Sequence, residues 1–234
     1  MNVLGIIPAR GGSKGIPRKN IKILNGKPLM SYTVQSALES QLLSRVILST
    51  DDPEIMAVGS DLGIEVPFER PSELAADNSP TLAVLLHAIE YFASREVFFD
   101  AVCILQLTSP FRRKGIIDEA IQLMMDQDSD SVISVLPVPH EFNPHWVFEP
   151  NNQGYLKIAT GEEKIIPRRQ ELPASYYRDG GLYLTKTQVL TSQRSLYGSK
   201  VGYVLGDEST HVNLDTMADW AQAEDMASKL FPST

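Results

Sequence analysis

A glycine-rich, cationic segment near the N-terminus is the part of this sequence whose residue types best suit chemistry. The segment Arg10–Gly15 reads RGGSKG and directly follows a short apolar run, Val3–Pro8. Glycines let backbone N–H groups fold around an anion because no Cβ atom is in the way. Arg10 and Lys14 add full positive charges, and Ser13 adds a hydroxyl donor. We therefore predict that this segment binds a triphosphate.

The distribution of charge along the chain also indicates an anion site at this end. Six cations and no acidic residue precede Glu39, although the 234-residue chain has a formal net charge of −8. A basic segment on an acidic body is typical of a local anion site. A solvated loop is the alternative that charge alone leaves open. The net acidity disfavours nucleic acid as a partner.

The spacing of the glycines argues against two common nucleotide-binding motifs. RGGSKG is not GxxxxGK[ST], which disfavours a P-loop kinase or ATPase, and it is not GxGxxG, which disfavours a dinucleotide-binding dehydrogenase. The single cysteine, Cys103, excludes an internal disulfide framework and a cysteine-based zinc site.

The elements that would position this segment alternate between strands and helices. Apolar runs typical of buried strands occur at Val3–Pro8, Arg45–Thr50, Glu65–Phe68, Ala101–Leu107, Ser131–Leu136, Leu182–Thr185 and Val201–Leu205. Helical spacing or helix-start signals occur at Met30–Glu39, at 53–63, from Ser79-Pro80 onward, at Gly115–Met125, Thr187–Gln193 and Thr216–Leu230. This alternation predicts an α/β fold with a mostly parallel sheet covered on both faces. Ligands bind such sheets beyond the carboxyl ends of the strands, where the glycine-rich segment falls.

The alternation breaks over 137–177, which contains six prolines and no long helical period. We interpret this stretch as an insertion that divides one domain into 1–136 and 178–234. The apolar run at the N-terminus lacks the preceding cations of a signal peptide. No stretch approaches the roughly 20 apolar residues that span a bilayer. We therefore expect a cytoplasmic protein without a membrane partner.

A series of ordered motifs resembles the acylneuraminate cytidylyltransferase family, with its legionaminate and pseudaminate relatives; the Kdo-activating enzymes are more distant. The matching segments span the chain: PARGGSKGIPRKN (Pro8–Asn20), NGKPL (Asn25–Leu29), STD (Ser49–Asp51), ERPSELAADNSPT (Glu69–Thr81), QLTSPFR (Gln106–Arg112), RRQELP (Arg168–Pro173), DGGLYL (Asp179–Leu184) and VNLDTMADW (Val212–Trp220). The resemblance implies a three-layer, Rossmann-like nucleotidyltransferase with a small dimerisation subdomain at 137–177. It also implies a homodimer that converts CTP and a nine-carbon 2-keto sugar acid into CMP-sugar and diphosphate. In that reaction the anomeric 2-hydroxyl attacks the α-phosphate.

The resemblance also assigns substrate contacts. It implies that CTP is bound by Arg10, Ser13, Lys14, Lys19, Asn20, Arg70, Asp77 and Ser79. It implies that the sugar is bound by Gln106, Arg169, Gln170 and Tyr183. The residues alone leave four alternatives open: Ser79 as a helix N-cap, Tyr183 as a core aromatic, Arg112 as a brace for its loop, and Arg168 in the place of Arg169.

A metal site is implied at Asn213-Leu214-Asp215, where relatives commonly have Asp-x-Asp. Asp215 offers a carboxylate to Mg²⁺, with Mn²⁺ as an alternative, whereas Asn213 offers a neutral oxygen or orients a water. Asp215 could instead cap the last helix, and Asp219 is expected to face solvent. We expect Arg10, Lys14 and Asp215 to be catalytic by neutralising charge on the phosphates. The residues indicate no general base.

Two other functions stay open at this stage. A Kdo-type or other sugar nucleotidyltransferase would share the fold and the phosphate loop. A nucleotide-binding regulatory protein with impaired catalysis would explain why Asn213 stands where relatives have an acid.

Overall fold

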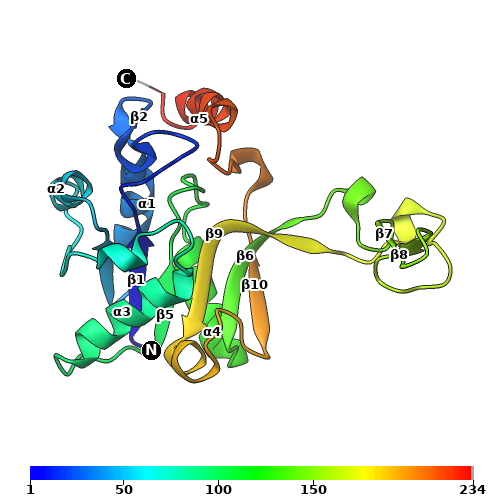
Figure 1. The fold of residues 1–234 in the computed structure, drawn as a ribbon, viewed down its shortest axis with the longest axis horizontal. Helices are drawn as coiled ribbons and strands as arrows, with labels where there is room; N and C mark the ends of the chain where they lie inside the picture. The colour runs from blue at the N-terminus through cyan, green and yellow to red at the C-terminus, as the bar shows by residue number, and fades with distance from the viewer. Residues whose placement is uncertain (233–234) are drawn as a thin grey trace.

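The computed structural model describes residues 1–232, which form a six-stranded sheet with helices on both faces (Figure 1). The strand order is β10-β6-β9-β5-β1-β4. The strands are β1 (Val3–Pro8), β4 (Arg45–Ser49), β5 (Ala101–Ile104), β6 (Ser131–Pro137), β9 (Tyr176–Lys186) and β10 (Val201–Leu205). Only β9 pairs antiparallel with its neighbours in this sheet. The predicted mostly parallel α/β architecture is therefore confirmed.

The two faces of the sheet are covered by different helices because strand side chains alternate between faces. On β1, Val3 and Ile7 belong to one apolar cluster and Leu4 and Ile6 to another. The first cluster includes α1 (Leu29–Leu38), α2 (Pro53–Asp61) and α4 (Ile116–Gln127). The second includes α3 (Thr81–Ala93) and the five-residue π-helix η5 (Val189–Gln193).

The last helix, α5 (Met217–Leu230), packs against the segment that runs from Ile16 to Tyr32. Its Trp220 packs in a third cluster with Leu24 and Leu29, next to the short hairpin of β2 (Ile23–Leu24) and β3 (Lys27–Pro28). The helix begins with a capping box formed by Thr216 and Asp219. In Figure 1, α5 lies beside β2 at the end of the molecule opposite the N-terminus.

Two local predictions are wrong. Glu65–Phe68 is not a strand, since only Glu65 makes an isolated bridge to Ile47 of β4, and Pro67 cannot donate a ladder hydrogen bond. Ser79 does not cap α3, because Pro80 occupies the N-cap position and the Ser79 hydroxyl donates to the Glu73 carbonyl at 2.6 Å. The helix predicted at Thr187–Gln193 forms, with π-helical geometry in η5 over Val189–Gln193.

The segment between β6 and β9 projects from the body as an arm (Figure 1). It carries the hairpin β7 (Phe148–Pro150) and β8 (Leu156–Ile158) and the short 3₁₀ helix η4 (Arg169–Glu171). Its fold is held locally, since the Trp146 indole N–H donates to the Ile166 carbonyl at 2.7 Å. Several large apolar side chains remain exposed on it: Phe142, Phe148, Tyr155, Leu156 and Ile165.

Within residues 1–232, none of the helices combines the length and the apolar character that crossing a membrane requires.

Candidate nucleotide site

The carboxyl ends of β1 and β5 open onto a cavity of about 440 Å³. It lies at the edge of the sheet where the glycine-rich segment leaves β1. Ten residues predicted from the sequence line it together: Arg10, Ser13, Lys14, Lys19, Asn20, Arg70, Asp77, Ser79, Gln106 and Asp215. These residues come from four separate stretches of the chain. The geometry therefore brings together most of the predicted site.

The glycine-rich segment is packed tightly against the segment that carries Asp215. A Cβ atom on Gly15 would lie 2.0 Å from the backbone oxygen of Asp215, so only glycine fits there. The Lys19 ammonium donates to the Leu214 carbonyl at 2.5 Å. Burial lowers the pKa of Lys19, and the nearby Asp215 carboxylate opposes that shift. These contacts place a carboxylate beside the glycine-rich segment.

Arg10 and Lys14 both direct their charges toward Asp77. One Arg10 guanidinium nitrogen lies 3.0 Å from Asp77 Oδ1, and Lys14 pairs with Asp77 Oδ2. The Lys14 hydrogen bond holds the pKa of Asp77 below its usual range. The two cations therefore meet at one anionic position inside the cavity.

Arg70 is the buried cation of the site. Its side chain is 4% exposed and donates to the Ala9 carbonyl at 3.1 Å and to Asp51 at 3.2 Å. Burial lowers its pKa, although the Asp51 hydrogen bond opposes the shift. Its Nε–H is buried and has no partner among the described residues. Because an unpaired buried donor is costly, this group is suited to a ligand acceptor such as a base carbonyl.

Arg112 braces the loop that carries Gln106. Its guanidinium donates to the carbonyl of Gln106 at 2.5 Å, to the carbonyl of Gly181 at 2.8 Å and to the Thr33 hydroxyl at 2.8 Å. Burial of this group lowers the pKa of Arg112 to about 10. These contacts match the bracing role that the sequence left open for Arg112.

Only one of the two residues predicted to bind the metal lines the cavity. Asp215 lines the cavity, whereas Asn213 does not, and the Asn213 amide donates to Asp215 Oδ2 at 2.8 Å. Asp215 does not cap α5, because Thr216 does. Asp219 is not a free solvent-facing residue, since its carboxylate accepts from the backbone N–H groups of Asp215 and Thr216.

No group of three or more His, Cys, Asp and Glu residues arranged to hold a metal occurs among residues 1–232. One carboxylate still fits Mg²⁺, which commonly takes one or two carboxylates and completes its shell with phosphates and water. The donor set present therefore suits a metal that arrives with a nucleotide.

Three predicted sugar contacts lie outside the cavity. Arg169 and Gln170 are exposed on η4 in the arm. Tyr183 is only 6% exposed and packs in the α3 cluster, 6.4 Å from the ring of Tyr197. Its place on β9 directs the ring toward α3, so the core-aromatic alternative describes its position.

The sequence analysis did not predict two further residues that line the cavity beyond β1 and β5. Leu107 and Thr108 line the cavity, and the Thr108 carbonyl accepts from the Leu214 backbone N–H at 2.9 Å. Their position directly after Gln106 in the QLTSPFR motif was the available signal.

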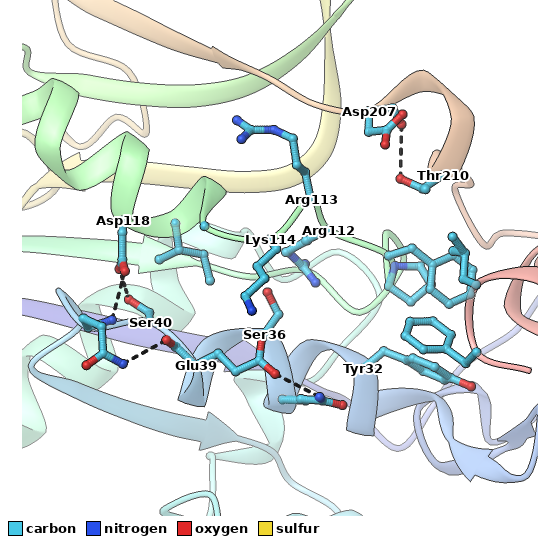
Figure 2. Close-up of a pocket in the computed structure, with 18 residues that line it drawn as sticks. Tyr32, Ser36, Glu39, Ser40, Arg112, Arg113, Lys114, Asp118, Asp207 and Thr210 are labelled. Carbon is cyan, nitrogen blue, oxygen red and sulfur yellow. Dashed lines mark hydrogen bonds between the residues drawn. The ribbon is translucent and has the colours of Figure 1, made fainter. Parts of the chain in front are cut away.

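A second cavity of about 660 Å³ lies between α1 and the start of α4. Figure 2 shows Lys114 reaching toward Ser36 and Glu39, with Asp118 bonded to Ser40. Its charged side chains are mixed in sign, and none of the predicted site residues lines it. Although this cavity is larger, the smaller one therefore holds the candidate site.

Comparison with known proteins agrees with this geometry. A family model described as "Cytidylyltransferase" matches residues 4–203. The chain is 33% identical to the CMP-N,N'-diacetyllegionaminic acid synthase of Legionella pneumophila, covering 96% of this chain and 95% of that protein. It is 32% identical to the pseudaminic acid cytidylyltransferase of Campylobacter jejuni, covering 94% and 93%.

A solved structure described as CMP:2-keto-3-deoxy-manno-octonic acid synthetase complexed with CTP superposes with a TM-score of 0.72, covering 99% of this chain and 100% of that one. At 18% identity, this likeness supports the fold alone. The family model and the two sequence relatives show more: the chain belongs to the cytidylyltransferase family, among its nonulosonate cytidylyltransferases.

Proposed function

We propose that this protein activates a nonulosonic acid, converting CTP and a nine-carbon 2-keto sugar acid such as a legionaminate into CMP-sugar and diphosphate. The observation that carries the proposal is a single cavity holding Arg10, Lys14, Asp215 and a buried Arg70 with an unpartnered Nε–H. The first two suit phosphates, and the last suits the carbonyl of cytosine. The relatives named above act on sugars of this class.

The reaction needs positioning and charge neutralisation more than a covalent intermediate. The anomeric 2-hydroxyl oxygen forms a bond to the α-phosphorus and loses its proton. The bond from the α-phosphorus to the oxygen that bridges to the β-phosphate breaks, and diphosphate leaves. Arg10 and Lys14 would neutralise charge on the departing group. Gln106, which lies in the cavity beyond β5, would hold sugar hydroxyls.

A divalent cation, Mg²⁺ or Mn²⁺, would be held by Asp215 and by the phosphates of CTP. When bound, it would supply electrostatic stabilisation of the phosphoryl oxygens. Asn213 holds the Asp215 carboxylate by its amide hydrogen bond. We therefore assign Asn213 the role of orienting the metal ligand rather than binding the metal.

We also propose that the working unit is a homodimer in which the arm serves the cavity of a second copy. Arg169 and Gln170 do not line the cavity of their own chain, and the arm projects away from the body (Figure 1). A guanidinium pairs bidentately with a carboxylate, which is the charged group of the sugar acid. The exposed apolar side chains of the arm would be covered in such a pair.

We propose that the protein acts in the cytoplasm.

The test is a diphosphate-release assay with CTP, Mg²⁺ and a panel of sugar acids that includes legionaminate, pseudaminate, N-acetylneuraminate and Kdo. We expect turnover with CTP and at least one nonulosonate, and little with other nucleoside triphosphates. Turnover with Kdo alone would favour the Kdo-type alternative. Tight CTP binding without turnover on any sugar would favour the regulatory alternative, which the Asn213 amide motivates.

A further inference from the structure

The cations of the glycine-rich segment already hold an anion that belongs to the protein. The Asp77 carboxylate lies 3.0 Å from an Arg10 guanidinium nitrogen and pairs through its other oxygen with Lys14. The same Arg10 nitrogen lies 3.4 Å from the Ala76 carbonyl. Segment 76–77 therefore contacts both positive groups that RGGSKG presents to the cavity.

This arrangement sets Asp77 in competition with phosphate. An ionised carboxylate only accepts hydrogen bonds, so it cannot donate to a phosphate oxygen. A polyphosphate bound to Arg10 and Lys14 would need the donors that Asp77 occupies, and the two anions would repel each other. Asp77 therefore competes with a triphosphate for these two cations.

We propose that Asp77 is an exchange residue for the diphosphate product. It holds Arg10 and Lys14 between turnovers, yields them to the triphosphate, and returns to them when diphosphate leaves. This inference rests on the proposed function, because it describes how the proposed site releases diphosphate. It also changes the role of Asp77 from a CTP contact to a competitor of CTP.

The structure permits such an exchange at little cost. The Asp77 side chain is 46% exposed, so its carboxylate can turn into solvent without leaving a packed site. The adjoining turn is held independently, since the Ser79 hydroxyl donates to the Glu73 carbonyl. Without Asp77, Arg10 and Lys14 would face each other unpaired whenever the site emptied, and they would retain diphosphate more strongly.

The test is titration calorimetry of inorganic pyrophosphate, without nucleotide and with EDTA present, into wild type, Asp77→Asn, Asp77→Ala and Glu73→Gln. We expect both Asp77 variants to bind pyrophosphate about three- to tenfold more tightly, the scale of exposed ion pairs. The gain should shrink in 0.5 M salt, where exposed charges are screened. Glu73→Gln removes the same charge from the same loop, and the Glu73 side chain makes no hydrogen bond or ion pair within residues 1–232. It should leave the affinity unchanged.

Unchanged or weaker pyrophosphate binding in Asp77→Ala would overturn the proposal. So would tightening confined to Asp77→Asn, because the new amide could then be the cause, and so would an equal gain in Glu73→Gln. None of these outcomes touches the proposed function, which fails instead if the wild-type protein binds no CTP with Mg²⁺. In the enzyme assay, the inhibition constant for diphosphate should fall by the same factor in both Asp77 variants.

Discussion

At the scale of single residues, the candidate site contains charged side chains that line the cavity. Arg70 keeps an unpaired buried N–H, and Asp215 is the one carboxylate in the cavity besides Asp77. Arg112, by contrast, has its guanidinium bonded to three oxygens and acts on Gln106 only through the backbone. We therefore propose that Arg70 and Asp215 contact substrate, whereas Arg112 positions Gln106.

Asp215→Asn should lower kcat by about 100-fold or more, the scale of losing one well-placed electrostatic group. Folding should survive, because Thr216 and Asp219 cap α5 without the Asp215 side chain. The measurements are steady-state kinetics with CTP and Mg²⁺, and a thermal melt. Near-normal turnover in this variant would refute the metal assignment.

Asn213→Asp provides the complementary change, since it restores a second carboxylate beside Asp215. We expect Mn²⁺ to bind this variant more tightly than wild type in the absence of nucleotide, measured by electron paramagnetic resonance. A variant with no added Mn²⁺ affinity would mean that a carboxylate introduced at position 213 does not reach the metal.

At the scale of elements, the site includes a contact between two loops that lie about 200 residues apart in the chain. Gly15 meets the backbone of Asp215, and Lys19 donates to Leu214. The strand that leads into the glycine-rich segment, β1, is buried over Val3–Ile7, and its neighbour β5 is buried along its whole length. The proposed binding residues therefore lie on loops that buried strands support.

Gly15→Ala should disrupt nucleotide binding, because its Cβ would press on the Asp215 carbonyl at 2.0 Å. We expect the affinity for CTP to fall at least tenfold, measured by calorimetry. Gly12→Ala is the matched control in the same segment, since its Cβ would meet nothing within 4 Å. Equal losses in the two variants would show that flexibility of the loop, rather than this contact, governs binding.

Cys103 on β5 makes the stability of the fold dependent on pH. Burial raises the pKa of its thiol to about 12. In the unfolded chain the thiol ionises near its ordinary value of roughly 8.5, so the unfolded state binds fewer protons between these values. This contribution to the free energy of unfolding is complete below about pH 8.5 and is lost as pH rises toward 12.

Urea titrations of wild type and Cys103→Ala at pH 7 and pH 10 test this expectation. The wild type should lose more stability over that interval than the variant, whose cavity lowers its stability at both values. In addition, Cys103 should not react with a thiol reagent at pH 8 until the protein unfolds. Rapid labelling of the native protein would contradict its burial.

At the scale of the whole molecule, the arm separates part of the predicted site from the cavity. Arg169 and Gln170 lie on a projection whose apolar side chains are exposed. A second copy would both cover those side chains and receive the two polar ones. The proposed active site is then complete only in the dimer.

Mixing Asp215→Asn with Arg169→Ala subunits tests whether the arm works in trans. If it does, a mixed dimer has one intact site, made of the Arg169→Ala cavity and the arm of the Asp215→Asn subunit. Random exchange should then restore about a quarter of wild-type activity, since half of the dimers are mixed and each has one of two sites. No recovery after proven subunit exchange would place the arm on its own cavity.

Much of this molecule was predictable from local sequence patterns. The alternation of apolar runs and helical spacing predicts the mostly parallel sheet, and RGGSKG after the first strand predicts residues that line the cavity. Asp52 before Pro53 predicts the start of α2, where the structure finds it as the N-cap. These features depend on neighbours along the chain, whose effects on backbone and burial are strong and short-ranged.

Other features were decided only by the tertiary structure. The pairing of Asp77 with Arg10 and Lys14, the bonds of Arg112 to Gly181 and Thr33, and the contact between Gly15 and Asp215 all join segments far apart in sequence. The direction of Tyr183 depends on the register of β9, where a shift of one residue would reverse its face. The sequence names the residue types that the chemistry needs. Packing of distant segments decides which of them meet, because contacts between loops depend on the positions of the strands that carry them.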